Sequence, residues 1–272
     1  MTPSEWTIPE RVAQYLERAD GFPHRAQGES VLFEHIPEDA RRVLDLGTGD
    51  GRLLALLRSD RPEIVGVGLD FSGVMLDAAH KRFAGDKRVE LVRHDLSEPL
   101  PTLGRFDAVI SSFAIHHLEH ERKRSLYGEV FDLLEPGGVF ANFEHVASTT
   151  HRLHVAFFAA IDEPIENEDP SDRLLDVQTQ LDWLRELGFD DVDCYWKWLE
   201  MALLVGVKPS DVTGADGKLV HVHVTEDRPA APLVPSYVLR SPGGSGTVAI
   251  SMLLIGLQPT GGQLVVKTHR TG

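Results

Sequence analysis

The sequence predicts an α/β protein in which a mostly parallel β-sheet carries helices on both faces and is followed by a small β-rich segment. Three observations support this fold class. Short apolar runs rich in valine, isoleucine and leucine alternate with segments of helical periodicity between residues 42 and 144. A glycine-rich turn at residues 47–51 joins the first of these runs to a helical segment. From Pro209 onward, alternating apolar patterns with intervening prolines and glycines replace the helical ones.

The elements follow one another along the chain in a simple order. Helices are expected at residues 7–38, 52–57, 72–82, 122–134, 151–161 and 177–187. Strands are expected at residues 42–46, 64–69, 89–92, 106–111, 138–144, 192–198 and 201–207. The last two strands are expected to form a hairpin, and Gly188 is a suitable end for the helix before them. Further strands are expected at residues 220–224, 237–239, 248–257 and 263–267.

Composition and charge restrict the class of protein. The 272 residues include 27 Lys+Arg and 42 Asp+Glu, a formal net charge of −15. All of the acidic excess lies in residues 1–208, because the remaining residues carry five basic and four acidic side chains. This charge disfavours nucleic acid as a partner. The single cysteine, Cys194, excludes an intrachain disulfide, and no apolar run is long enough to span a membrane. We therefore expect a cytoplasmic protein without a membrane partner.

A glycine-rich turn, Asp45-Leu46-Gly47-Thr48-Gly49-Asp50-Gly51, follows the first predicted strand. Glycines at alternate positions let the backbone turn sharply and approach a ligand closely. The first N–H groups of the following helix are available to a polar or anionic group. The turn is therefore typical of a cofactor site, although an ordinary tight turn in an α/β protein has a similar sequence.

Two aspartates follow the next two predicted strands. Asp70 lies 23 residues after Gly47, where a carboxylate accepts both hydroxyl groups of a ribose in dinucleotide-binding folds. The alternative is that Asp70 caps the helix that begins near Ser72. Asp95 follows the third strand, and it either meets the exocyclic amine of an adenine or is a solvated turn residue.

The ordered segments DLGTGDG, GLD, RHDL, FDAVISSFAIHHL and LLEPGGVF resemble those of the class I S-adenosylmethionine-dependent methyltransferases. The resemblance covers residues 40–207. Gly47, Gly49 and Gly51 give the spacing G-x-G-x-G, which differs from the G-x-G-x-x-G of nicotinamide-binding proteins. The resemblance implies a Rossmann-like, seven-stranded sheet in the order 3-2-1-4-5-7-6, with an antiparallel seventh strand.

The resemblance also implies that the cofactor is S-adenosylmethionine, which is converted to S-adenosylhomocysteine. The residues expected to hold it are Asp45, Gly47, Thr48, Gly49, Gly51, Asp70, Phe71, Asp95, Leu96, Ser112 and Phe113. Those from Asp45 to Gly51 would bind the methionine part, Asp70 the ribose, and Asp95 with Leu96 the adenine. Ser112 and Phe113 would border the sulfonium and the substrate pocket.

The domain organisation follows from the same resemblance. Residues 1–208 are expected to form the methyltransferase domain, with residues 1–40 as an N-terminal helical lid that includes Trp6, Tyr15 and Arg25. Residues 209–272 are expected to be a β-rich appendage, in which we recognise no family motif and which is a candidate surface for homo-oligomer formation.

The segment at residues 181–189 and the hairpin after it are similar to the small-molecule branch of the family. They are also similar to the carboxy-S-adenosylmethionine synthases. Those synthases hold the additional carboxylate with an arginine on this helix, and Trp183 lies at that position here. Trp183 therefore disfavours carboxy-S-adenosylmethionine formation.

Four side chains after the fourth and fifth predicted strands are candidate general bases: His116, His117, Glu144 and His145. In open α/β sheets, ligands bind at the carboxyl ends of the strands, where these residues lie. Histidine suits a base because its ordinary pKa is near neutrality. The alternative is that these histidines only pack and cap the following helix. A base is required only if the acceptor arrives protonated.

The segment His116-His117-Leu118-Glu119-His120 offers a possible metal site, because histidines four residues apart share a helix face. The sequence shows no third ligand, and Glu119 is misplaced for the H-E-x-x-H pattern. We therefore expect no metal.

The predicted function is methyl transfer from S-adenosylmethionine to a small molecule by in-line displacement, with an oxygen or a carboxylate as the favoured acceptor. The first alternative is different S-adenosylmethionine chemistry, such as carboxy-S-adenosylmethionine formation. The second is a non-catalytic cofactor-binding module that assembles through its C-terminal appendage.

Overall fold

The computed structural model describes residues 8–10, 12–13, 21–213, 219–225, 238–240, 247–249 and 265–268. The chain divides into two compact units, Met1–Pro209 and Ser210–Gly272.

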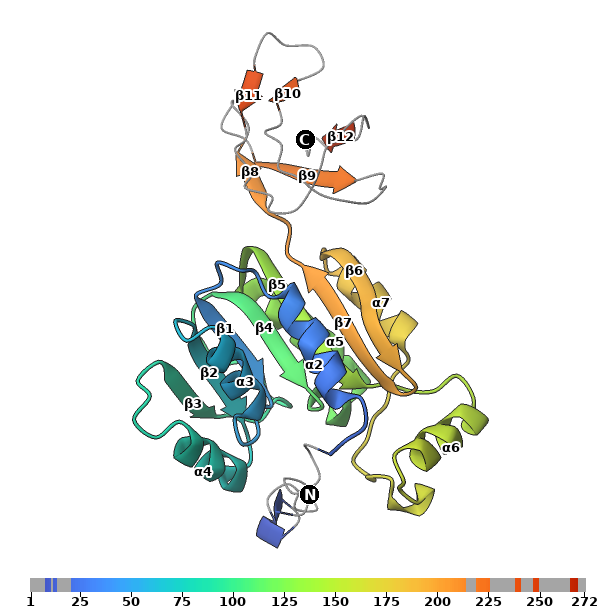
Figure 1. The fold of residues 1–272 in the computed structure, drawn as a ribbon. Coiled ribbons are helices and arrows are strands. Elements are labelled where there is room, and N and C mark those ends of the chain that lie inside the picture. The colour runs from blue at the N-terminus through green and yellow to red at the C-terminus, as the bar shows by residue number, and fades with distance from the viewer. Residues whose placement is uncertain are drawn as a thin grey trace. The chain divides into compact units, whose positions relative to one another are not determined.

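The larger unit is built on a seven-stranded sheet in the order β3-β2-β1-β4-β5-β7-β6 (Figure 1). Its strands are β1 (Arg42–Leu46), β2 (Val65–Asp70), β3 (Val89–Arg93), β4 (Phe106–Ser112), β5 (Leu134–His145), β6 (Asp190–Trp198) and β7 (Met201–Val207). Strands β1 to β5 pair in parallel, whereas β7 runs antiparallel to both β5 and β6. This order and these directions confirm the predicted Rossmann-like fold.

Helices cover both faces of the sheet (Figure 1). They are α2 (Arg25–His35), α3 (Arg52–Asp60), α4 (Gly73–Arg82), α5 (His120–Leu133), α6 (His151–Ala160) and α7 (Val177–Glu186), with short 3-10 turns η2 (Ile115–His117) and η3 (Ile165–Asn167). Residues of α2 and α3 pack into one hydrophobic cluster, and residues of α5 and α7 pack into a second. The sheet therefore separates two apolar layers.

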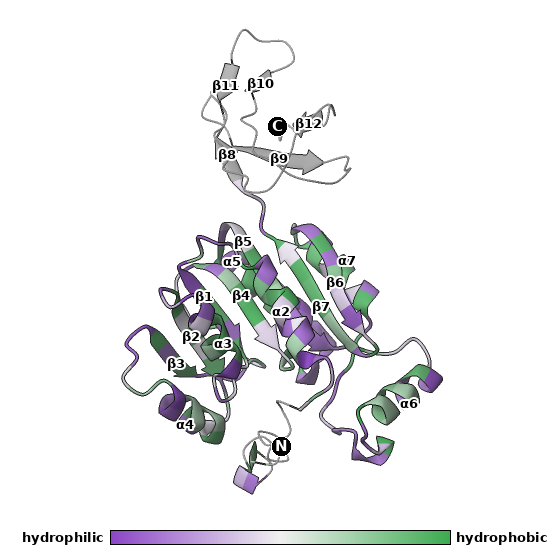
Figure 2. Ribbon diagram, viewed as in Figure 1, coloured by the Kyte–Doolittle hydropathy of each residue, from purple (hydrophilic) through white to green (hydrophobic). Residues whose placement is uncertain are grey.

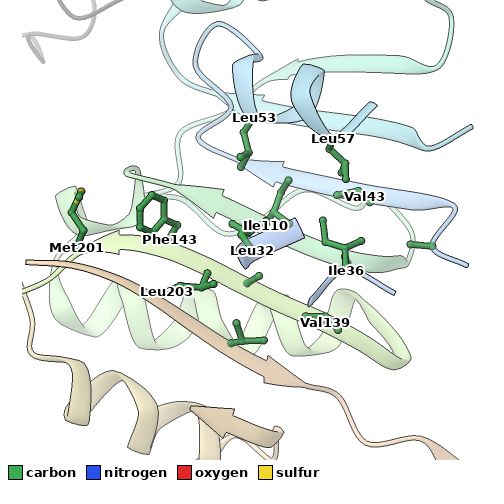
Figure 3. Packing of buried hydrophobic residues seen from close by; sticks show 14 of the residues in the cluster. Leu32, Ile36, Val43, Leu53, Leu57, Ile110, Val139, Phe143, Met201 and Leu203 are labelled. Carbon is green, nitrogen blue, oxygen red and sulfur yellow. The ribbon is translucent and has the colours of Figure 1, made fainter. Parts of the chain in front are cut away.

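Alternation along the strands assigns each apolar side chain to one layer. Val43 joins the cluster under α2 and α3, whereas its neighbours Leu44 and Leu46 join the cluster under α5 and α7. Figure 3 shows Leu32 of α2 and Leu53 of α3 in the first cluster. Hydrophobic residues are concentrated in the central strands β4, β5 and β7 (Figure 2). Because these strands are covered on both faces, apolar side chains of β4 and β5 enter both layers.

Strand β5 begins four residues earlier than its sequence indicates. Leu134 pairs with Phe106, and the pairing then shifts so that Ala108 faces Val139. The Pro-Gly-Gly turn, which was expected to precede the strand, is therefore a bulge inside it, and Gly137 has a φ of 82° there.

The smaller unit contains short strands: β8 (Asp211–Thr213), β9 (Leu219–Thr225), β10 (Val238–Arg240), β11 (Thr247–Ala249) and β12 (Val265–Thr268). Strand β9 pairs antiparallel with β8 and β12, and β10 pairs antiparallel with β11. Of the strand predicted at residues 248–257, the structure describes only residues 248–249, which belong to β11, and the rest lies outside the described residues. Within the described residues, no helix has the length and apolar character needed to cross a membrane.

Candidate functional site

The glycine turn after β1 is built from residues with left-handed backbone. Gly47, Gly49 and Gly51 have φ angles of 69°, 57° and 77°. A Cβ atom at Gly47 would lie 2.1 Å from the Cβ of Ala114, in the segment after β4. By contrast, a Cβ at Gly49 would meet no atom of the described residues closer than Met75 Sδ, at 3.8 Å. The turn is therefore closed by protein at Gly47 and leaves open space at Gly49.

Asp70, at the end of β2, holds this turn in place. Its Oδ2 accepts a hydrogen bond from the Gly49 N–H at 2.8 Å, and its Oδ1 accepts one from the Ser72 N–H at 2.8 Å. The hydroxyl of Ser72 caps α4 by accepting a hydrogen bond from the N–H of Met75. Ser72, rather than Asp70, is thus the cap of this helix. Burial raises the pKa of Asp70, against the opposing effect of these backbone hydrogen bonds.

Asp45 lies at the buried end of β1. Its side chain is almost fully enclosed, and its Oδ2 accepts a 2.7 Å hydrogen bond from the Thr48 hydroxyl. Burial raises the pKa of Asp45 to about 7, and the hydrogen bond from Thr48 partly offsets this rise. The nearby carboxylate of Asp70 raises the pKa of Asp45 further.

The other predicted cofactor residues lie at the carboxyl ends of their strands. Asp95 is exposed, and its Oδ1 accepts a hydrogen bond from the Ser97 N–H at 2.9 Å, whereas Leu96 is buried. Phe71 follows β2 directly and is half-buried. Ser112 ends β4, and its buried hydroxyl oxygen has no hydrogen-bond partner among the described residues. Phe113 follows with a φ of 53°.

These residues fit S-adenosylmethionine. Gly49 offers a space that a Cβ would fill, and the unpaired Ser112 hydroxyl is available for a polar group. The carboxylates of Asp45 and Asp70 are suited to an ammonium group and to ribose hydroxyls, respectively. The donors and acceptors needed for the cofactor are thus present around one glycine turn.

A second group of ionisable side chains lies beside this turn, and we call it the acid–histidine cluster. Its members are His116, His117, Glu144, His145, Asp172 and Glu200. The two histidines of η2 come only two and three residues after Ala114, the residue against Gly47. The segment that carries these two histidines therefore starts beside the glycine turn, and all four predicted base candidates belong to the cluster.

Two hydrogen-bonded pairs organise the cluster. His116 Nδ1 lies 2.6 Å from Oε1 of Glu144, and His145 Nε2 lies 3.1 Å from Oε2 of Glu200. Asp172 lies between the histidines, with Oδ1 3.2 Å from His117 Nδ1 and Oδ2 3.5 Å from His145 Nδ1. The side chains of the first pair are nearly inaccessible to solvent, whereas His117 is 22% exposed. Of the three cluster histidines, His117 is thus the most accessible to a substrate.

The environment of the cluster shifts the pKa values of two of its histidines, His116 and His145, in opposite directions. Burial lowers the pKa of His116, and the neighbouring His117 lowers it further. Burial alone would lower the pKa of His145 as well, but hydrogen bonds and charges from Asp172 and Glu200 outweigh it and raise that pKa to about 9. Burial opposes ionisation of Asp172, yet its close contacts with the imidazoles of His117 and His145 hold its pKa well below the usual range. At neutral pH the cluster therefore contains a charged imidazolium at His145 and a neutral imidazole at His116.

The sequence analysis did not predict three residues that the structure places in this region: Asp172, Glu200 and Lys123. Asp172 comes from the acidic irregular segment after α6, and Glu200 from the turn between β6 and β7. Lys123 of α5 is buried and donates a hydrogen bond to the carbonyl of Arg173, and the Arg173 N–H donates one to the carbonyl of His116 at 2.9 Å. The antiparallel hairpin brings Glu200 to the carboxyl end of β5, because Met201 pairs with His145. No local sequence pattern indicates either contact.

Two other predictions concern the surroundings of the site. Arg25 is buried on α2, where its Nε donates to Glu29 at 2.8 Å and its guanidinium lies 5.3 Å from the centre of the Phe113 ring. Trp6 and Tyr15, the other expected lid residues, lie outside the described residues. Trp183 packs against the hydrophobic cluster under α5 and α7.

Comparison with known proteins identifies the domain. Residues 43–138 match the family model described as a methyltransferase domain. The chain is 36% identical over 102 residues to a demethylmenaquinone methyltransferase of Clavibacter sepedonicus, covering 38% of this chain and 40% of that protein. It is 24% identical over 234 residues to a carboxy-S-adenosyl-L-methionine synthase of Klebsiella pneumoniae, covering 76% of this chain and 93% of that protein.

A solved structure supports the same fold. An O-methyltransferase family protein from Burkholderia thailandensis superposes with a TM-score of 0.62 at 21% identity, covering 75% of this chain and 62% of that one. The chain spans about half the length of the curated relatives that it matches at higher identity. The methyltransferase-domain match over residues 43–138, the sheet order and the glycine turn together support the class I S-adenosylmethionine-dependent methyltransferases as the family to which this segment is similar.

Proposed function

We propose that this protein transfers a methyl group from S-adenosylmethionine to an oxygen of a small molecule, and that the acid–histidine cluster activates this acceptor. The observation that carries the proposal is the position of the cluster. The segment that supplies His116 and His117 begins next to Ala114, which packs against Gly47 of the cofactor turn. Groups able to take a proton thus lie beside the residues suited to hold the methyl donor.

The cofactor, when bound, supplies an electrophilic methyl group: the acceptor oxygen bonds to the methyl carbon while the carbon–sulfur bond breaks and leaves its electrons on sulfur. The protein holds the cofactor at the glycine turn, Asp45 and Asp70. A hydroxyl acceptor must also lose a proton, and we assign its removal to His117, the most accessible histidine of the cluster. Glu144 orients the His116 ring through the 2.6 Å hydrogen bond between its Oε1 and His116 Nδ1. His145 orients the Asp172 carboxylate through the 3.5 Å contact between its Nδ1 and Asp172 Oδ2.

The acceptor class follows from this base. A hydroxyl group needs proton removal before or during transfer, whereas a carboxylate already carries the attacking charge. The same cluster would serve a carboxylate less well, since Glu144, Asp172 and Glu200 add negative charge around it. Small hydroxylated molecules are therefore the first acceptors to test.

A direct test is the formation of S-adenosylhomocysteine with a panel of small hydroxylated and carboxylated compounds, followed by mass spectrometry of the product. We expect His117→Ala to lower kcat by roughly 100-fold or more with a hydroxyl acceptor, the typical contribution of a general base. Its matched control is His120→Ala, an exposed histidine three residues further along the chain. A panel without any methylated product, or equal kcat values for the two variants, would overturn the assignment.

Carboxy-S-adenosylmethionine formation is a second candidate, favoured by the similarity to the Klebsiella pneumoniae synthase along most of that protein's length. Against it, Trp183 lies at the position of the arginine that holds the extra carboxylate in such synthases, and here it packs against the core. The mass of a cofactor purified with the protein separates the two functions, because the carboxylated form is heavier than S-adenosylmethionine.

A further inference from the structure

We propose that His116, His117 and Asp172 bind a divalent transition-metal ion. One ligand atom from each of these three side chains lies within 4.8 Å of the other two. The sequence suggested no third ligand for the two histidines, because Asp172 lies more than fifty residues further along the chain. The fold supplies this ligand by returning the segment after α6 to η2.

The first argument is an unsatisfied oxygen. The Asp172 side chain is 8% exposed, and its Oδ1 accepts no well-directed hydrogen bond from the described residues. Its other oxygen faces His145. Leaving a buried carboxylate oxygen without a partner is costly. A cation beside Oδ1 would remove this cost, and Oδ1 is the oxygen that faces His116 and His117.

The second argument is the spacing of the donor atoms. His116 Nε2 and His117 Nδ1 lie 3.6 Å and 3.2 Å from Oδ1 of Asp172. In a tetrahedral zinc site with ligand distances of about 2.1 Å, neighbouring donor atoms lie about 3.4 Å apart. These two distances are close to those around a bound ion, and one ligand atom from each of the three side chains lies within 4.8 Å of the other two.

The third argument is the outer hydrogen bond of His116. Its Nδ1 lies 2.6 Å from Oε1 of Glu144. The same buried carboxylate oxygen also accepts a hydrogen bond from the backbone N–H of His145 at 3.0 Å. Metal-binding histidines commonly donate their second N–H to such a carboxylate, which fixes the ring and its tautomer. In that tautomer the Nε2 lone pair of His116 faces Asp172.

The position of Asp172 is fixed independently of any ion. The next residue, Arg173, donates its N–H to the carbonyl of His116 and accepts a hydrogen bond from Lys123. His117 Nδ1 lies 3.0 Å from the Ser171 hydroxyl, which itself donates to Asp169. Metal binding therefore requires the His117 proton to move to Nε2, leaving the Nδ1 lone pair for the ion.

The ligand set determines the class of ion. Two imidazoles and one carboxylate suit zinc and its first-row neighbours, whereas magnesium and calcium prefer oxygen ligands. Three protein ligands leave coordination positions open, as in catalytic rather than structural zinc sites. A consequence that rests on the proposed function is that the ion would bind the acceptor's oxygen and lower its pKa, so that the hydroxyl releases its proton to water and His117 acts as a ligand rather than as the base.

The test measures metal binding directly, without cofactor or acceptor, so its outcome does not depend on methyl transfer. Untagged, chelator-stripped full-length protein is titrated with Zn²⁺ by calorimetry and with Co²⁺ by visible absorption. The background carries His221→Ala and His223→Ala, so that the alternating histidines of the C-terminal unit bind no zinc. The compared variants are Asp172→Asn and His117→Ala, with His120→Ala as the matched control and thermal melting as the check of folding.

We expect one Zn²⁺ per chain in the parent and in His120→Ala, and binding weakened by roughly 100-fold or more in Asp172→Asn and His117→Ala. Glu144→Gln should weaken binding roughly 10- to 100-fold, the usual effect of losing an outer hydrogen bond to a ligand. The absence of stoichiometric zinc binding, unchanged affinity in both folded ligand variants, or equal affinity for Mg²⁺ and Zn²⁺ would each overturn the site. If one ligand variant fails to fold, the other decides.

Discussion

Asp70 and Gly49 are joined by a 2.8 Å hydrogen bond from the Gly49 N–H to Asp70 Oδ2, although they belong to different strand–helix connections. The side chain proposed to bind the ribose therefore also holds the turn proposed to bind the methionine part. Cofactor affinity and the geometry of the turn depend on the same carboxylate, and a variant that removes it changes both.

This relationship predicts two effects of Asp70→Ala. Cofactor affinity should fall because the ribose loses its acceptor, and stability should fall by about 1–3 kcal/mol because buried N–H groups lose theirs. Asp70→Asn keeps one acceptor oxygen, so it should lose less stability while still binding the cofactor weakly. Calorimetric titration with S-adenosylmethionine and denaturant unfolding measure the two effects. Normal cofactor binding by Asp70→Ala would show that the ribose position is wrong.

The glycine turn allows a sharper test with a matched pair. Gly49 and Gly85 both have left-handed φ angles, 57° and 82°, and neither has a neighbouring atom that a new Cβ would clash with. Gly49→Ala and Gly85→Ala should therefore each lose about 1–2 kcal/mol of stability from backbone strain. Only Gly49→Ala should lose cofactor affinity, because its Cβ occupies the space proposed for the ligand. Equal affinities in the two variants would place the cofactor elsewhere.

Asp45 predicts a pH dependence of stability in the absence of cofactor. Its ordinary pKa of 3.8 is raised to about 7 in the folded state, mainly by burial. Because the pKa of Asp45 is higher in the folded than in the unfolded state, the protonated carboxyl stabilises the folded state. This stabilisation is complete below pH 3.8 and is lost as the pH rises to about 7. The shift corresponds to about 4 kcal/mol at most.

Urea unfolding of the wild type and of Asp45→Asn across this range isolates the effect. The asparagine variant should become more stable relative to the wild type as the pH rises, and the difference should level off above pH 7. A difference in stability that does not change with pH would contradict the raised pKa. The same variant should bind S-adenosylmethionine more weakly if Asp45 holds the cofactor's ammonium group.

The division of the chain after Pro209 supports a truncation experiment. We propose that the first unit holds the complete cofactor site, because every described residue assigned to it lies before that point. The truncated protein should therefore keep its affinity for S-adenosylmethionine, measured by calorimetry. Loss of oligomers in gel filtration would assign assembly to the C-terminal unit, whereas loss of cofactor binding would show that the larger unit is not sufficient.

The strands and the glycine turn in the N-terminal half of the sheet could be predicted from the sequence, because each depends on residues that are close together along the chain. The run at residues 42–46 is apolar and ends in closely spaced glycines, so both the strand β1 and the turn follow from neighbouring residues. Asp70 was located by its distance from this turn, and the carboxyl ends of parallel strands meet at one edge of the sheet. The start of β5 was not predicted, because a bulge at Gly137 depends on pairing with β4 rather than on local propensity.

The sequence by itself determined the fold class and the position of the glycine turn, and it predicted the four base candidates, because each depends on periodicity or on spacing along one segment. Only the tertiary structure decided what surrounds these bases. Asp172 and Glu200 reach His145 from two different connections, at 3.5 Å and 3.1 Å, through the packing of the segment after α6 and the antiparallel pairing of β7. Contacts of this kind depend on how distant segments pack, and no short-range pattern in the sequence records them.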